Sequence, residues 1–125
     1  MEESMKSNPD CMRDVLFAVE AAPLGAHITE RELSAWLPQW SKDDIIYSCI
    51  QLGKAQYLEV EEKHYIRSCG VEVHDLTPQG HLALSNIRTD TVWNKAKTIA
   101  LKAGKAGIVA LVDIAKDIVA SGMIG

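Results

Sequence analysis

The stretch LTPQGHLALSNIRTDTVWNKAK, from Leu76 to Lys97, decides the fold of this chain. It has the pattern of a strand end followed by two helices in close succession. Thr77 is suited to cap the first helix, and Pro78 suits its first position. The second helix is predicted to begin near Thr89. Trp93 is predicted to anchor it, because a tryptophan contributes mainly through its burial.

A β-hairpin is expected immediately before this stretch. Apolar and acidic residues alternate over residues 58–61, which is the period of a half-buried strand. Residues 64–66 continue that strand, and residues 68–70 are expected to form the turn. The alternation then resumes over residues 71–74, which indicates the return strand.

Three helices are predicted before the hairpin. Asn8 is suited to cap the first helix, which ends at Pro23. The capping-box pattern of Thr29–Glu32 begins the second helix. Ser41 opens a third helix that runs to about Ala55, and a very short strand is expected at residues 27–28.

Three helices followed by a hairpin, in this order, are typical of a winged helix-turn-helix. The predicted fold class is therefore α+β, with three helices plus a β-hairpin wing over residues 8–88. Two additional C-terminal helices are expected within residues 89–125, with a joint between Gly104 and Gly107. The last helix has an amphipathic stripe and is expected to fold back over the first helix or the base of the wing.

The composition is that of a small globular protein, with 47% hydrophobic and 24% charged residues. The N-terminus lacks the pattern of a secretory signal, and Asp113, Lys116 and Asp117 interrupt any apolar run long enough to span a membrane. The three cysteines are odd in number and widely spaced, which favours reduced thiols. We therefore expect a cytoplasmic protein with no membrane partner.

Charge is divided unevenly along the chain. Residues 1–89 hold 8 Lys and Arg residues against 14 Asp and Glu, whereas residues 90–125 hold 5 Lys against 3 Asp. An acidic body repels phosphate unless its cations gather on one face. Any DNA-binding surface on residues 1–89 would therefore have to concentrate its few cations.

Four short motifs carry a family resemblance: Leu76-Thr77, Gly80-His81, Ile87-Arg88 and Asp90–Lys95. They resemble the YjcQ-like family of small bacterial and phage-borne proteins. The resemblance implies a winged-helix fold and a bacterial or prophage origin, and it brings no assigned function or catalytic residues. The chain departs from the family at Pro78, where an aromatic residue is usual, and at Gln56, where a glycine usually ends the third helix.

The first functional hypothesis is nucleic-acid binding, as in a transcription regulator. In a winged helix the third helix can enter the major groove while the wing meets the backbone. Tyr47, Gln51 and Lys54 are expected on the outward face of the third helix. Gln51 suits adenine and Lys54 suits phosphate, with Lys63 and Arg67 available on the wing.

Acidic residues near this surface weigh against DNA. They lie at the start of the third helix and along the wing, at Asp43, Asp44, Glu59, Glu61, Glu62 and Glu72. The alternative is a protein-interaction module, self-associating or with another protein. Its surface would use the apolar residues Ile46, Ile50, Ile108, Leu111, Val112, Ile118 and Val119. The same residues also suit a plain core, and the two possibilities can coexist.

No enzymatic activity, cofactor, metal or small-molecule substrate is expected. His64, Cys69, His74 and His81 fall within 18 residues, but they form no C-x-x-C or H-x-x-x-H pair. The chain also lacks a glycine-rich phosphate loop. No nucleophile, base and orienting group can be placed together in one cleft.

Overall fold

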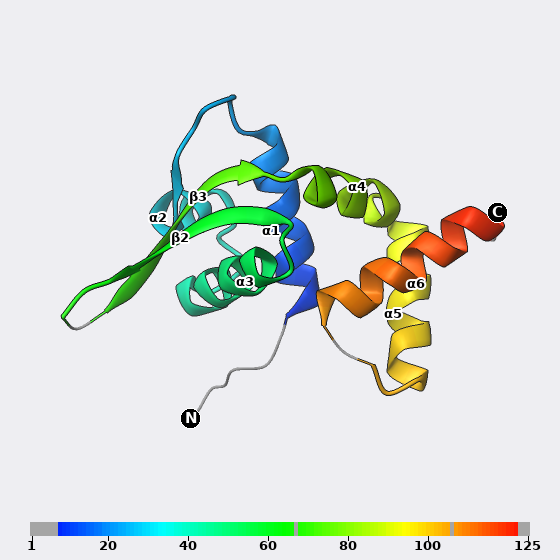
Figure 1. Ribbon diagram of the computed structural model, residues 1–125. Coiled ribbons are helices and arrows are strands. Elements are labelled where there is room, and N and C mark those ends of the chain that lie inside the picture. Colours follow the sequence, from blue (N-terminus) through cyan, green and yellow to red (C-terminus); the bar gives the residue numbers. More distant parts are fainter. Residues whose placement is uncertain (1–7, 67, 106, 123–125) are drawn as a thin grey trace.

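The computed structural model describes residues 8–66, 68–105 and 107–122. Within them the chain is α+β, with six helices and one three-stranded antiparallel sheet. The helices are α1 (Pro9–Ala21), α2 (Glu30–Trp36), α3 (Lys42–Lys54), α4 (Pro78–Ile87), α5 (Asp90–Lys102) and α6 (Ile108–Ser121). The strands are β1 (Ile28–Thr29), β2 (Leu58–His64) and β3 (Cys69–Leu76). In Figure 1 the hairpin of β2 and β3 extends to one side and α4–α6 lie on the other.

Five of the six helices begin with a side-chain cap that their sequence predicts. In each case the capping side chain accepts a hydrogen bond from the backbone N–H three residues on. The five residues are Asn8, Thr29, Ser41, Thr77 and Thr89. Helix α6 differs, because its N-cap residue is Gly107, with a φ of 97° and no side-chain hydrogen bond.

The central strand of the sheet is β3, in the order β1-β3-β2. Val71 and Val73 point inward and are buried, with α1 and α3 packed against the strand. Glu72 and His74 alternate with them and lie half-buried on the outer face. The sheet therefore has an apolar inner face and a polar outer face.

Two details near the hairpin differ from the sequence prediction. The short strand covers Ile28–Thr29 rather than residues 27–28, since Ile28 is where its pairing with β3 begins. The turn lies earlier than residues 68–70. The Tyr65 N–H donates to the Ser68 carbonyl (2.8 Å), and strand pairing starts at once with His64 and Cys69.

A side chain occupies the edge of β3 beyond the short strand β1. The last paired residues there are Thr29 and Glu72. Immediately beyond them, the Glu30 carboxylate accepts a hydrogen bond from the Val71 N–H (2.8 Å). A Cβ at Gly70 would lie 2.8 Å from a Glu30 oxygen, so the glycine makes room for this contact.

Trp93 anchors α5 on α1, as predicted. Its side chain is 2% exposed, and its Nε1–H donates to the Asp10 carboxylate (2.8 Å). The Lys97 ammonium binds the same carboxylate oxygen (2.8 Å). Arg13 lies over the Trp93 ring and donates to the Ile87 carbonyl at the end of α4 (2.9 Å). These contacts join α1, α4 and α5.

Helix α6 packs chiefly on α5 and α4, rather than over α1 or the base of the hairpin as the sequence suggested. The chain reverses at the predicted joint, where Gly104 and Gly107 have φ values of 68° and 97°. This reversal turns α6 back across α5 (Figure 1). A single apolar cluster includes residues of all the helices from α1 to α6. The division of the chain into a domain of residues 8–88 and an extension of residues 89–125 stays a prediction.

The end of α3 requires a left-handed residue. The Tyr57 N–H donates to the Leu52 carbonyl and the Gln56 N–H to the Gly53 carbonyl, both at 3.0 Å, which is a Schellman motif. Gln56 is the residue in the left-handed position, with a φ of 67°. This geometry gives the physical reason why a glycine is favourable at that position.

Replacing Gln56 by glycine is expected to raise the free energy of unfolding by about 0.5–1 kcal/mol. The left-handed strain is relieved, and the added freedom of the unfolded chain offsets part of the gain. Urea unfolding measures the change. The matched control is Gln51→Gly inside α3, which should lower the free energy of unfolding by about 0.5–1 kcal/mol. Destabilisation by both variants would contradict the strain at Gln56.

Asp10 at the start of α1 is held ionised by its partners. Partial burial raises the pKa of this carboxyl, but the hydrogen bonds from Lys97 and Trp93 and the charges of Lys97 and Arg13 together lower it by more. The pKa of Asp10 in the folded chain therefore lies below its ordinary value of 3.8. A depressed carboxyl pKa stabilises the fold above the unfolded-state pKa, and this contribution is lost as the pH falls through the folded-state pKa.

The substitution Asp10→Asn is expected to lower the free energy of unfolding by about 0.5–1 kcal/mol at pH 7, as for other partly exposed charge pairs. The difference should shrink as the pH falls below 3.8 and through the lower folded-state pKa, where Asp10 itself becomes protonated. Urea unfolding at pH 7 and pH 3 measures both values. Asp117→Asn, at an exposed position of α6, serves as the control and should change little. A difference that stays the same at both pH values would show that the charge is not responsible.

Candidate functional site

The outward face of α3 carries the side chains that the sequence placed there. Tyr47 and Gln51 are half-buried, and Lys54 is exposed in the last turn. They follow one another at spacings of four and three residues, so they lie along one side of the helix. Lys54 forms no ion pair among the described residues.

Gln51 and Lys54 line a groove of about 270 Å³ between the end of α3 and the start of α6. The opposite wall is formed by residues 107–110, where α6 begins. The first turn of α6 has neither a side-chain cap nor an acidic residue. Among the described residues, its backbone N–H groups thus have no capping side chain and no acidic residue in the same turn, and they suit an anion.

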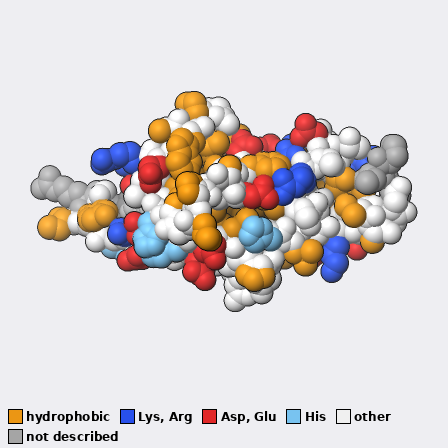
Figure 2. Space-filling model, turned by 90° about the horizontal axis from the view of Figure 1, so that it is seen from above, with side chains coloured by type: hydrophobic (Ala, Val, Ile, Leu, Met, Phe, Trp, Pro, Cys, Tyr) orange, Lys and Arg blue, Asp and Glu red, His pale blue; other side chains and the backbone are white. Residues whose placement is uncertain are grey.

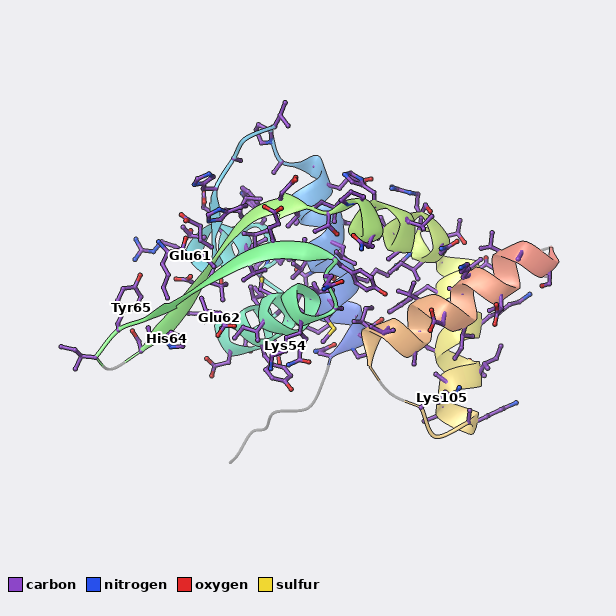
Figure 3. All side chains as sticks on the ribbon, viewed as in Figure 1. Lys54, Glu61, Glu62, His64, Tyr65 and Lys105 are labelled. Atoms are coloured by element: carbon purple, nitrogen blue, oxygen red, sulfur yellow. The ribbon has the colours of Figure 1, made fainter. Side chains whose placement is uncertain are left out.

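Charged side chains of both signs lie near this groove. Figure 3 shows Lys54 beneath α3 and Lys105 in the loop before α6, on the same lower side of the view. Both lysines are exposed. Glu61 lies on the outer face of the hairpin, whereas Glu62 is on the opposite face of β2, on the side of α3. The acidic first turn of α3, with Asp43 and Asp44, is at the opposite end of the helix from Lys54.

Lys63, one of the two cations predicted on the wing, does not line this groove. Lys63 lies on β2, and its Nζ is 3.7 Å from a Glu72 oxygen on the neighbouring strand. Arg67 lies outside the described residues. The structure thus brings Gln51 and Lys54 together on the groove and places Tyr47 on the same helix face.

Most of the apolar residues predicted for an interaction surface are buried within this one chain. Those with 7% exposure or less are Ile46, Ile108, Leu111, Val112 and Ile118. Ile50 is half-buried, and Val119 is 40% exposed. Only these last two of the seven side chains could meet a partner without a movement of the helices.

An apolar groove of about 470 Å³ between α1 and α2 escaped the sequence analysis. Phe17, Trp36 and Leu37 line it, and Trp36 is 47% exposed. Asp14 at its edge accepts a hydrogen bond from the Trp40 Nε1–H (2.8 Å). The aromatic residues of these two helices were the signal in the sequence that could have indicated such a groove. The sequence does not show how the two helices pack against each other, so the groove could not be predicted.

The outer face of the sheet assembles a group of possible metal ligands, which the sequence analysis also missed. The ligand atoms of His27, Glu72 and His74 lie within 4.8 Å of one another. Among the histidines considered from the sequence, His74 alone belongs to this group. His27 joins it through the pairing of β1 with β3, which the spacing of residues could not reveal.

The described cysteines have the character of core residues. Burial raises the pKa of the Cys11 thiol to about 11 and that of Cys49 to about 12. Thiols with raised pKa values are poor nucleophiles at neutral pH. Neither is therefore suited to covalent catalysis.

Comparison with known proteins identifies a family and no more. A family model described as "Hypothetical protein (DUF2513)" matches residues 6–106, which is most of the chain. No curated protein and no solved structure matches. Within the described residues, no helix has the length and apolar character needed to cross a bilayer.

Proposed function

We propose that this chain, which belongs to the uncharacterised DUF2513 family, is a winged-helix protein that binds nucleic acid through α3 and the start of α6. The observation that carries the proposal is the groove where Gln51 and Lys54 face the uncapped first turn of α6. An amide, a cation and a helix N-terminus are groups that nucleic-acid-binding proteins use for bases and phosphates.

The order of elements supports the winged-helix assignment. It runs helix, strand, helix, helix and two-stranded hairpin, and the sheet order is β1-β3-β2. The resemblance of residues 76–95 to the YjcQ-like family points to the same fold and to a bacterial or prophage origin. A cytoplasmic regulator without enzymatic activity, cofactor or membrane partner fits this assignment.

Charge favours one direction of approach for the nucleic acid. The hairpin carries exposed glutamates at positions 59, 61 and 62, which repel phosphate. The α3–α6 side offers Lys54 and Lys105 instead. In this arrangement Gln51 faces the bases, while Lys54 and the N–H groups of α6 hold the backbone. The start of α6 then takes the role that the wing has in many winged helices.

A protein-interaction module is the second candidate, favoured by the hairpin tip. Tyr65 is 60% exposed there, and the Ile66 side chain is fully exposed. Exposed apolar side chains beside an acidic strand suit a protein surface better than a polyphosphate. This candidate predicts no affinity for DNA at any salt concentration.

Fluorescence anisotropy with labelled random-sequence duplex DNA tests the proposal. We expect binding tighter than about 10⁻⁴ M at low salt, with an affinity that falls as salt rises. Lys54→Glu should weaken binding at least about tenfold, because it replaces a phosphate contact by a repulsive charge, and should reduce the salt dependence.

Lys116→Glu provides the matched control, because Lys116 is an exposed lysine of α6 beyond its first turn and outside the groove. It makes the same change in net charge and should weaken binding much less. Equal effects of the two variants would overturn the assignment of the groove. Absence of binding by the unmodified chain at low salt would overturn nucleic-acid binding and leave the protein-interaction module.

A further inference from the structure

We propose that His27, Glu72 and His74 form a binding site for a divalent transition-metal ion on the outer face of the sheet, with Glu61 as a fourth ligand. The first three residues bring their ligand atoms within 4.8 Å of one another. The site is independent of the groove between α3 and α6. Figure 2 shows histidine side chains beside acidic side chains on the face viewed there.

Strand pairing builds the site from three separate segments. Glu72 and His74 are two residues apart on β3, so both point to the outer face. Ile28 pairs with Val73, which places His27 beside His74, and the two imidazole rings stack with centroids 4.4 Å apart. Glu61 on β2 pairs directly with Glu72. The central strand thus supplies two ligands and each neighbour supplies one.

The distances suit a tetrahedral ion. His74 Nε2 lies 3.1 Å from a Glu72 oxygen and 3.3 Å from a Glu61 oxygen. His27 Nδ1 lies 4.0 Å from the same Glu72 oxygen. Ligand atoms that are each about 2.0–2.2 Å from a tetrahedral zinc are separated by roughly 3.4 Å. Small side-chain rotations would therefore bring His27, Glu72 and His74 into range of one ion. Glu61 already lies beside His74 and would approach the same ion by turning its side chain.

Electrostatics favour a cation at this point. Glu61 and Glu72 are like charges directly opposite each other on neighbouring strands, an arrangement that costs stability. A divalent ion would neutralise both glutamates.

The ligand set selects the class of metal. Two imidazoles with carboxylates and no thiolate suit Zn²⁺ and its neighbours, such as Co²⁺ and Ni²⁺. Ca²⁺ and Mg²⁺ prefer ligand sets made of oxygen alone. The His27 side chain is 60% exposed, so an ion has access from solvent. Lys63, with its side chain 37% exposed, competes for Glu72 but is free to swing away.

Titration of the chelator-treated full chain with Zn²⁺ at pH 7.5, followed by calorimetry, tests the site. One ion per chain with an affinity on the order of 10⁻⁶ M or tighter is expected, along with a raised Tm. Ca²⁺ and Mg²⁺ should leave the Tm unchanged. His27→Gln and His74→Gln should each weaken Zn²⁺ binding at least about tenfold. Lys63→Ala should strengthen it, since a competing cation is removed.

Two controls separate this site from other zinc binding. His64→Gln changes a histidine of the same hairpin that is paired with Glu62 rather than with the site (3.8 Å), and it should keep the original affinity. Cys69→Ser removes the hairpin thiol and should also bind one ion. Bound Co²⁺ should show d–d absorption without a thiolate charge-transfer band.

Three results would overturn the proposal. One is unchanged Zn²⁺ affinity in both His27→Gln and His74→Gln, with circular dichroism showing that the variants remain folded. Another is loss of binding in Cys69→Ser. The third is the absence of a saturable site in the unmodified chain.

Discussion

The contact of Trp93 with α1 is the interaction on which the shape of the molecule depends. The buried indole and its hydrogen bond to Asp10 hold α5 against the first helix, and Arg13 ties the end of α4 to the same point. Helix α6 docks on the α4–α5 pair that these contacts position. The Trp93 contact therefore helps to place the start of α6, which lines the same groove as Lys54.

Two surfaces of opposite character result. The α3–α6 side offers lysines and an uncapped helix start, whereas the hairpin offers carboxylates and histidines. Anions are favoured by the first surface and cations by the second. A net charge of −4 for the whole chain conceals this division. This division of charge explains why the acidic composition weighed against DNA binding, whereas the local geometry at α3 and α6 is compatible with it.

Local signals predicted much of the fold, and long-range contacts supplied what was missing. Caps such as Thr77 and Ser41 depend on neighbouring residues, so the sequence located the helix starts. The glycine expected at Gln56 also has a local cause, in the left-handed backbone there. The proximity of His27 to His74 depends on strand register, and the groove at Lys54 depends on how α6 docks. Neither of these two spatial arrangements produces a periodic pattern in the sequence.

The hydrogen bond from Val71 to Glu30 has a consequence for how the chain behaves in a crowded solution. A strand that outruns its short neighbour exposes backbone donors that another polypeptide can pair with, the first step towards aggregation. The Glu30 carboxylate accepts the hydrogen bond of the Val71 N–H, which lies on β3 just beyond the end of β1. Its negative charge also repels the backbone carbonyl of an approaching strand. On the opposite border, the exposed glutamates of β2 make that edge unattractive in the same way. The acidity of the hairpin thus protects the sheet from joining the sheets of other molecules.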